Sequence, residues 1–316
     1  MEALLQRAII GIGHVVLVLL VSPLMVNLIK KIKAHFQCRR GPGLLQGYYD
    51  LWKLLKKDAV ISEHASWIFR ATPYVVFSAT LLAAAIIPAF TVLPPIGRVG
   101  DVIAVIYLLG LARFFTALAG LDTASSFGGM GSSREMMISS LAEPVIITAL
   151  FVLAITAGST NLSEIISSSL TSGYMQPSYL LILLALLIVV IAETGRVPVD
   201  NPATHLELTM VHEAMVLEYT GRDLALIEWA SSIKLMLLLT LIANVFLPWG
   251  IARETTWVFM LSGIAAIVIK VTVLASIIAV VESSTAKLRL FRVPELIGGS
   301  FALAMLALIL RITGKG

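Results

Sequence analysis

The residues of this chain best suited to chemistry are titratable side chains gathered in residues 192–229. This stretch holds seven of the 19 acidic residues and two of the five histidines. Carboxylates and imidazoles at hydrogen-bond or water-bridged spacing can pass protons, and burial or neighbouring charges tune their pKa values for that task. The stretch therefore predicts a proton-handling chamber that a partner covers. Its members are Glu193, Asp200, His205, Glu207, His212, Glu213, Glu218, Asp223 and Glu228.

A second group of charged residues interrupts long apolar segments. Ionisable residues inside a membrane-spanning helix are expensive and are functional by default. For Glu143, Lys234 and Lys270, which fall within such segments, we therefore favour a proton or ion path. Glu135 lies eight residues before Glu143 and shares its side if the helix already extends there.

Three further charges lie in reach of an interface or a partner. Snorkelling or structural ion pairing between spans is the favoured interpretation for Arg113, Glu193 and Glu282. Glu193 and Glu282 end their apolar segments, so they stay candidates for the same proton path.

The elements that position these residues are membrane helices. The 316 residues are 58% hydrophobic and 13% charged, with a mean hydropathy of +0.95, whereas a soluble domain carries about 25% charged residues. Apolar runs of about 20 residues indicate helices and not barrel strands, which are about half as long. The sequence predicts an all-α integral membrane protein. Eight spans are expected near residues 8–29, 71–93, 101–121, 137–157, 177–194, 229–249, 257–281 and 296–312.

Charge predicts the orientation of the spans. The loops at residues 30–70, 122–136, 195–228 and 282–295 hold 15 Lys and Arg residues, and the side with both termini holds five. The positive-inside rule then predicts that both termini lie outside and that the long loops are cytoplasmic. The net charge of +4 reflects this bias, so no nucleic-acid partner is expected. Trp229 and Trp249 are 20 residues apart and are expected in the two aromatic belts.

Two loop segments have predicted structure of their own. Between the first two spans, the apolar residues from Leu44 to Leu55 follow helical spacing, which predicts an amphipathic helix in the membrane interface, in contact with lipid. If residues 206–218 are helical, Glu207 and Glu218 project to nearly the same side. That helix is either solvated or, as we favour, partly buried.

Several other kinds of site are not expected. Cys38 is the one cysteine, so the chain forms no internal disulfide and holds no iron–sulfur cluster. The histidines and glutamates of residues 205–213 do not follow a metal-binding spacing. The Gly128–Gly131 turn lacks the lysine of a phosphate-binding loop and is interpreted as a flexible loop. No nucleophile and base pair stands out, so we predict no catalytic site.

Three stretches in chain order resemble one known family. Residues 39–43 (RRGPG) with Gln46, Asp50 and residues 53–55 resemble the first cytoplasmic loop of the complex I membrane subunit that borders the quinone chamber. Residues 192–200 (AETGRVPVD) are similar to its signature after the fifth span. Residues 218–221 (EYTG) resemble the motif that closes the same loop. The resemblance covers nearly the whole chain.

Other stretches resemble the hydrogenase branch of that family. Residues 120–135, the pair Glu143-Pro144 and residues 282–289 look like the membrane anchor subunit of formate hydrogenlyase and related energy-converting NiFe hydrogenases. Ala203 and His205 stand at two positions that are acidic in complex I, which weakens the case for a bound quinone.

The resemblance implies a hetero-oligomeric complex in the cytoplasmic (inner) membrane. The partners would be a small iron–sulfur subunit, a large NiFe subunit and antiporter-like membrane subunits, with no cofactor in this chain. It implies a proton path through acidic residues and makes four arginines candidates for docking or for pKa tuning. The acidic candidates are Glu135, Glu143, Glu193, Asp200, Glu207, Glu213 and Glu218, and the arginines are Arg39, Arg40, Arg134 and Arg196.

Three rival functions stay open, the simplest of which is a pure membrane anchor with no proton path. The chain could be the quinone-chamber subunit of a quinone-reducing complex, which quinone dependence of the purified complex would reveal. It could also be a stand-alone ion transporter. That class predicts transport by the isolated chain and usually shows internal repeats with broken helices, which this sequence does not.

Overall fold

A computed structural model describes residues 2–63, 65–92, 95, 100–169, 176–201, 210–252 and 257–314. The described residues form α-helices and one short 3-10 helix, which confirms the predicted all-α class. The helices are α1 (Glu2–Phe36), α2 (Gln46–Leu55), α3 (Trp67–Ile86), α4 (Val102–Asp122), α5 (Ser126–Ala157), α6 (Leu162–Ser169), α7 (Pro177–Glu193), α8 (His212–Val216), α9 (Gly221–Phe246), α10 (Trp257–Ser284) and α11 (Val293–Ile312), with η2 (Leu290–Arg292) before α11.

Length and composition identify the membrane helices. Among the described residues, seven helices are long and apolar enough to cross a membrane: α1, α3, α4, α5, α9, α10 and the η2–α11 segment. The apolar helix α7 occupies the remaining predicted span with 17 residues, or about 25 Å at 1.5 Å per residue. The chain is therefore a multi-pass membrane protein.

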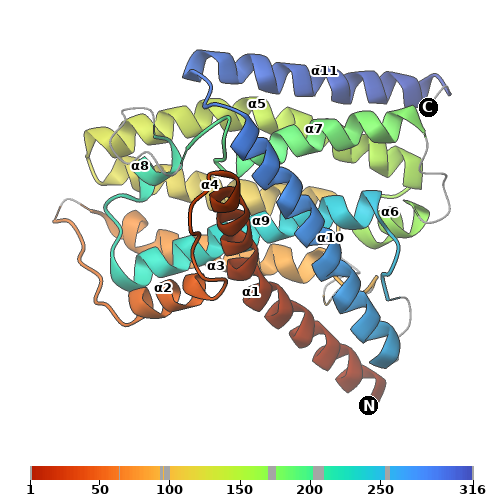
Figure 1. The fold of residues 1–316 in the computed structure, drawn as a ribbon, viewed down its shortest axis with the longest axis horizontal. Coiled ribbons are helices and arrows are strands. Elements are labelled where there is room, and N and C mark those ends of the chain that lie inside the picture. The colour runs from red at the N-terminus through yellow and green to blue at the C-terminus, as the bar shows by residue number, and fades with distance from the viewer. Residues whose placement is uncertain are drawn as a thin grey trace.

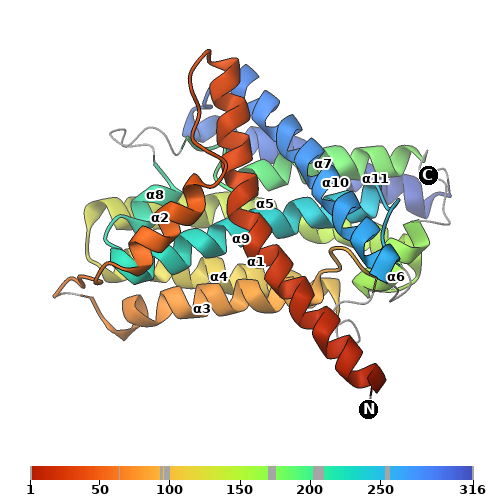
Figure 2. The same ribbon diagram turned by 60° about the horizontal axis from the view of Figure 1, so that its bottom comes forward.

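The spans fall into two groups by direction. Helices α3, α4, α5, α7, α9 and α11 run side by side, whereas α1 and α10 pack on one another and cross this group obliquely (Figure 1 and Figure 2). Helix α9 lies at the centre, where it contacts α1, α3, α7 and α10. On the outer side of the bundle, α11 packs on α5 and α7.

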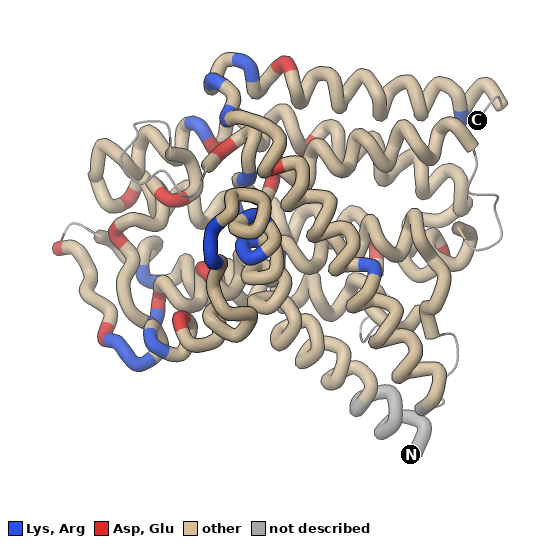
Figure 3. The backbone as a smooth tube through the Cα atoms, in the orientation of Figure 1, with Lys and Arg blue, Asp and Glu red and all other residues tan. Residues whose placement is uncertain are grey.

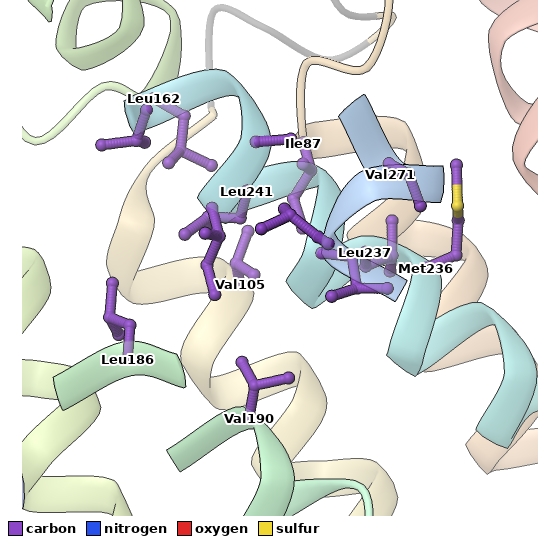
Figure 4. Close-up of a cluster of buried hydrophobic side chains, with 14 of the residues drawn as sticks. Ile87, Val105, Leu162, Leu186, Val190, Met236, Leu237, Leu241 and Val271 are labelled. Atoms are coloured by element: carbon purple, nitrogen blue, oxygen red, sulfur yellow. The ribbon is translucent and has the colours of Figure 1, made fainter. Parts of the chain in front are cut away.

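The apolar core gathers around α9. Met236, Leu237 and Leu241 of α9 are buried against Val105 of α4 and Val271 of α10 (Figure 4). These contacts bring the two groups of spans together. The polar side chains on the same helix are therefore held at fixed depth and rotation.

Both chain termini lie at the same end of the bundle, and α2 and α8 lie at the opposite end (Figure 1). Most Lys and Arg residues gather at that opposite end (Figure 3). We call it the loop face and the other end the terminal face. The assignment of the loop face to the cytoplasm stays a prediction from the positive-inside rule.

The predicted interfacial helix is present as α2. None of its residues is buried, and Tyr49 and Trp52 are exposed. The Tyr48 hydroxyl donates to the carbonyl oxygen of Leu20 on α1, and partial burial raises the pKa of this phenol. Helix α2 is therefore fastened to the bundle while its aromatic side chains face outward, as an interfacial helix requires.

The prediction of a flexible loop at Gly128–Gly131 was wrong, because α5 begins at Ser126 and includes these residues. Ser125 caps this helix and accepts a hydrogen bond from the backbone nitrogen of Gly128 at 3.1 Å. A Cβ atom added to Gly128 would lie 2.3 Å from the carbonyl oxygen of Gly120 on α4. Gly128 thus serves the close packing of α5 on α4, and Gly131 serves its packing on Ala214 of α8, where a Cβ atom would lie 2.9 Å from the Ala214 Cβ atom.

Several helices differ in extent from the spans predicted for them. Helix α1 continues to Phe36 and α3 already begins at Trp67, which shortens the expected loop at residues 30–70. Helix α9 begins at Gly221 and not at Trp229. The Trp229 indole therefore does not mark a helix end; its nitrogen donates to the carbonyl oxygen of Leu19 at 3.1 Å.

The close approach of α4 and α5 leads to a first prediction. Gly128→Ala should lower the free energy of unfolding by about 1–3 kcal/mol, the range for overpacking, because its Cβ atom would collide with backbone. Gly129→Ala is the matched control, since nothing lies within 4 Å of a Cβ atom there. Thermal unfolding of the purified variants in detergent measures both. Equal stability of the two variants would contradict the proposed packing.

Candidate functional site

The candidate site is built around Arg113, which α4 carries into the bundle interior. One terminal nitrogen, Nη1, donates to Oε1 of Glu193 at the end of α7. The other, Nη2, donates to Oε1 of Glu143 on α5 at 2.6 Å. Arg113 is only 8% exposed, and the Glu193 side chain is buried as well, so the bond between them lies where water competes little and charge-assisted hydrogen bonds are strong.

Lys234 on α9 is the second cation of the site. Its Nζ donates to Oε2 of Glu193 at 2.8 Å and to the backbone oxygen of the same residue at 2.9 Å. That backbone oxygen ends α7, where the negative end of the helix dipole favours a cation. Arg113, Glu143, Glu193 and Lys234 thus join four helices, and we call them the ion cluster.

The two carboxylates of the ion cluster differ in exposure. The Glu193 side chain is 4% exposed and faces both cations, whereas the Glu143 side chain is 44% exposed. Glu143 lines a groove between α4 and α5 together with Gly110, Phe114 and Ser139. Glu143 is therefore the carboxylate that groups outside the bundle can reach.

A cavity of about 60 Å³ lies on the other side of the ion cluster. That volume holds a few water molecules, since each needs about 10–15 Å³. Glu135 of α5 and His212 of α8 line it together with Arg113, Glu193 and Lys234. The structure thus brings Glu135 and His212 to the same space as the ion cluster.

Asp200 is a loop anchor, separate from the ion cluster. It is 2% exposed, and its Oδ1 accepts from Lys287 Nζ at 3.2 Å. Its Oδ2 accepts from the backbone nitrogens of Val211 at 3.1 Å and His212 at 3.4 Å. These bonds hold the start of the loop against its end and against the segment that follows α10.

Glu282 anchors a second place on the loop face. Its Oε1 accepts from Arg196 Nη1 at 2.7 Å, and its Oε2 accepts from Lys33 Nζ at 3.1 Å. Glu282 therefore ties α10 to α1 and to the loop after α7. The structural ion pairing expected for this residue is present.

The remaining predicted path residues are scattered. Glu213 is half-buried in α8 and Glu218 is exposed on the loop face. Lys270 lies on α10 beside Asn244 of α9. Asn244 is ten residues beyond Lys234, or about 15 Å along α9. Glu207 and His205 lie outside the described residues, as do the other residues of 202–209.

The four docking candidates also separate. Arg39 and Arg40 are exposed after α1. Arg134 donates to the backbone oxygen of Met210 at 3.2 Å, and Arg196 is bonded to Glu282. Two of the four arginines are thus presented outward, and two hold the loop.

The stretch from Glu218 to Gly221 fastens the end of the loop. The Tyr219 ring stacks on Phe69 with centroids 3.9 Å apart, and its hydroxyl donates to the Phe69 carbonyl oxygen at 2.9 Å. Burial raises the pKa of this phenol. Gly221 has φ +55°, and a Cβ atom there would lie 2.4 Å from the Asp58 carbonyl oxygen. Glycine is needed at this contact.

Sequence reasoning underestimated Arg113. The signal was its depth: it is the twelfth residue of α4, too deep for its guanidinium to reach water easily. Snorkelling is wrong for this residue, and the alternative of ion pairing between spans is confirmed. The described residues contain no group of three or more His, Cys, Asp or Glu that could hold a metal ion.

Comparison with known proteins gives the family. The family model described as NADH dehydrogenase matches residues 9–313. The chain belongs to the NADH dehydrogenase family. This confirms the resemblance inferred from the loop motifs.

Two relatives of this family member come from Escherichia coli (strain K12). Hydrogenase-4 component C is 36% identical over 307 residues, covering 97% of this chain and 96% of the relative. Formate hydrogenlyase subunit 4 is 36% identical over 290 residues, covering 92% and 94%.

A solved structure shares the fold. A chain of the membrane-bound sulfane sulfur reductase, an archaeal respiratory membrane complex, matches with a TM-score of 0.85. The match covers 98% of this chain and 100% of that chain at 18% identity, so it shows the fold alone.

The ion cluster leads to a second prediction. Glu193→Gln leaves Arg113 and Lys234 without their shared carboxylate and should destabilise the protein by about 3–5 kcal/mol, the range for breaking a buried ion pair. Glu218→Gln, at an exposed position, is the control and should change stability by less than about 0.5 kcal/mol. Thermal unfolding in detergent measures the difference. A Glu193→Gln protein as stable as the control would contradict the pairing.

Proposed function

We propose that this chain is the membrane subunit of a hydrogenase complex of the formate hydrogenlyase type. In this role it docks a peripheral arm on its loop face and couples redox chemistry in that arm to proton movement through the membrane. The names of the two relatives of 36% identity support the class of complex. The ion cluster is the observation that carries the coupling role.

The ion cluster suits coupling because its charges depend on one another. Arg113 divides its two terminal nitrogens between Glu143 and Glu193, and Lys234 also binds Glu193. Protonation of Glu143 would remove one anion from Arg113 and strengthen the hold of Arg113 on Glu193. Loss of that proton would reverse the change. A change of charge beside the cavity, at Glu193, can thus alter the proton affinity of Glu143 in the groove.

The cavity and the groove lie on two sides of the ion cluster, which gives the proposed path a direction. Glu135 and His212 line the cavity that lies toward the loop face, and Glu143 lines the groove between α4 and α5. We assign Glu135, Glu193 and Glu143 to the path in that order, with Lys234 as the fixed charge that sets the proton affinity of Glu193. Asp200 and Glu282 are assigned to holding the loop, because each is fully engaged in ion pairs.

The redox centres are assigned to partner subunits. An iron–sulfur cluster usually takes four cysteine ligands, and this chain has Cys38 alone. We propose that a small iron–sulfur subunit and a large NiFe subunit cover the loop face. The exposed Arg39 and Arg40 suit an acidic surface on that arm. Antiporter-like subunits would lie alongside, within the membrane.

Purification of the intact complex in mild detergent tests the class. We expect a NiFe subunit, an iron–sulfur subunit and a formate dehydrogenase subunit to accompany this chain. Purification of this chain alone would contradict the proposal and favour a stand-alone transporter. Activity that depends on added quinone would favour the quinone-chamber subunit.

A substitution of Glu143 tests the coupling. Glu143→Gln keeps a hydrogen-bonding group of the same size but cannot release a proton. In membrane vesicles that hold the intact complex, we expect hydrogen evolution to continue while formate-driven proton movement, followed by a pH-sensitive dye, falls at least about tenfold, as for loss of an essential proton-transfer group.

Glu218→Gln is the control for that experiment, because Glu218 is exposed and lies outside the ion cluster. It should leave both hydrogen evolution and proton movement intact. Unchanged proton movement in Glu143→Gln would mean that the chain is an anchor without a proton path.

A further inference from the structure

Lys270 is a buried amine with few partners among the described residues. The residue lies within α10 and is 1% exposed. In the part of the chain that the structure describes, its Nζ contacts one acceptor, Oδ1 of Asn244, at the long distance of 3.4 Å. None of the ion pairs of the described residues includes Lys270. A charged ammonium carries three donors, so this setting fits an ammonium poorly.

Asn244 is held so that it can only accept from Lys270. Its Nδ2 donates to the carbonyl oxygens of Pro88 at 2.8 Å and Ala89 at 2.7 Å. Both amide hydrogens are therefore used, and the amide oxygen must face the lysine. A neutral amine satisfies this oxygen with one N–H and keeps its lone pair free.

Lys234 shows what a charged lysine receives elsewhere in the same bundle. Its Nζ has a carboxylate at 2.8 Å and a carbonyl oxygen at 2.9 Å. Lys270 has neither at hydrogen-bonding distance in the described part of the chain. The two lysines therefore occupy opposite settings, one built for the cation and one that accommodates the neutral amine.

An aromatic ring connects Lys270 with the terminal face. The centroid of the Trp249 ring lies 5.1 Å from Nζ, and Trp249 is 53% exposed. This indole follows α9 at the end of the bundle that carries both termini. It can stabilise a newly formed ammonium through its face.

Other titratable groups on the packed elements are already engaged. His14 of α1 bonds through Nε2 with the carbonyl oxygens of Ala84 and Ile87. Glu282 and Lys33 pair at the loop-face end of α10 and α1, and Lys234 of α9 binds Glu193. Arg253 and Glu254 lie outside the described residues.

We propose that Lys270 is a proton-exchanging amine that opens to the terminal face. In the resting state it is –NH2; it takes up a proton from water at that face to become –NH3⁺, and it releases that proton again to restore –NH2. This deepens the proposed function by adding a titrating group about 15 Å along α9 from the ion cluster. The titration itself requires no partner subunit.

Tryptophan fluorescence tests the titration, because an ammonium that forms beside an indole changes its emission. In the full chain reconstituted in lipid nanodiscs, we expect a one-proton transition between roughly pH 6 and 9, a range in which a lysine in water stays charged. Trp249→Phe and Lys270→Arg should each abolish it. The arginine variant keeps a donor for Asn244 and never releases its proton, so it separates titration from folding.

Two controls make the assignment specific. Lys56→Met removes the other lysine that lies over an indole, 4.9 Å from the Trp52 ring, and should leave the transition unchanged. Glu254→Gln should also leave it unchanged. The absence of a transition in the parent protein, its persistence in Lys270→Arg, or its loss in Glu254→Gln would each overturn the proposal.

Sealed vesicles test the face to which Lys270 opens. Cys38 is exposed on the loop face, so an impermeant maleimide identifies vesicles in which that face is outward. In vesicles that resist labelling, a pH change outside should produce the fluorescence transition at once. A transition that follows the pH of the loop face instead would overturn the assignment.

Lys270→Arg also tests whether this site belongs to the proposed proton path. Lys270→Arg in the intact complex should slow proton movement at least about tenfold while hydrogen evolution continues. If the parent chain shows the fluorescence transition and the Lys270→Arg complex moves protons normally, Lys270 does exchange a proton, but it lies outside the coupled path. An absent transition together with a Glu143→Gln defect would overturn this inference and leave the proposed function intact.

Discussion

The structure depends on the shared use of Glu193 by two cations. A carboxylate taken out of water is stable only where cations and donors replace its hydration. Glu193 ends α7 and receives Arg113 from α4 and Lys234 from α9, while Arg113 also reaches Glu143 on α5. Four helices must therefore keep fixed rotations about their axes, since rotation of any one would leave a charged side chain without its partner. The apolar core around Leu237 and Leu241 maintains those rotations.

The loop on one face is fixed by charges as well. Asp200 binds Lys287 and two backbone nitrogens, and Glu282 binds Arg196 and Lys33. These pairs hold α8 against the beginning of α5, so that His212 borders the same cavity as Glu193. The acidic stretch thus divides its carboxylates between two tasks. Some shape the chamber, and one lies at its centre.

The sequence was sufficient for the fold class, because long apolar runs leave few alternatives. It also named most of the residues that matter, since a charge inside such a run is conspicuous. It could not show which charges meet. Arg113, Glu143, Glu193 and Lys234 are far apart in the chain, and their contact depends on helix rotations set by packing.

Local boundaries failed for a related reason. The glycines at 128–131 have low helix propensity and predict a loop, but the close approach of α4 makes Gly128 necessary inside a helix. The Asp200 anchor was equally hidden, because Lys287 lies 87 residues away. Both cases are decided by tertiary contacts that no local pattern contains.

Lys234 and Lys270 show how one type of side chain can serve two purposes. Lys234 contributes a fixed positive charge, because Glu193 and the end of α7 surround it with negative charge. Lys270 meets an amide oxygen whose own hydrogens are bound elsewhere, and an indole face. The first setting stabilises a charge permanently, and the second lets it come and go. A chain that moves protons needs both, since a permanent charge sets the affinity of its neighbours and only a group that changes charge can carry the proton onward.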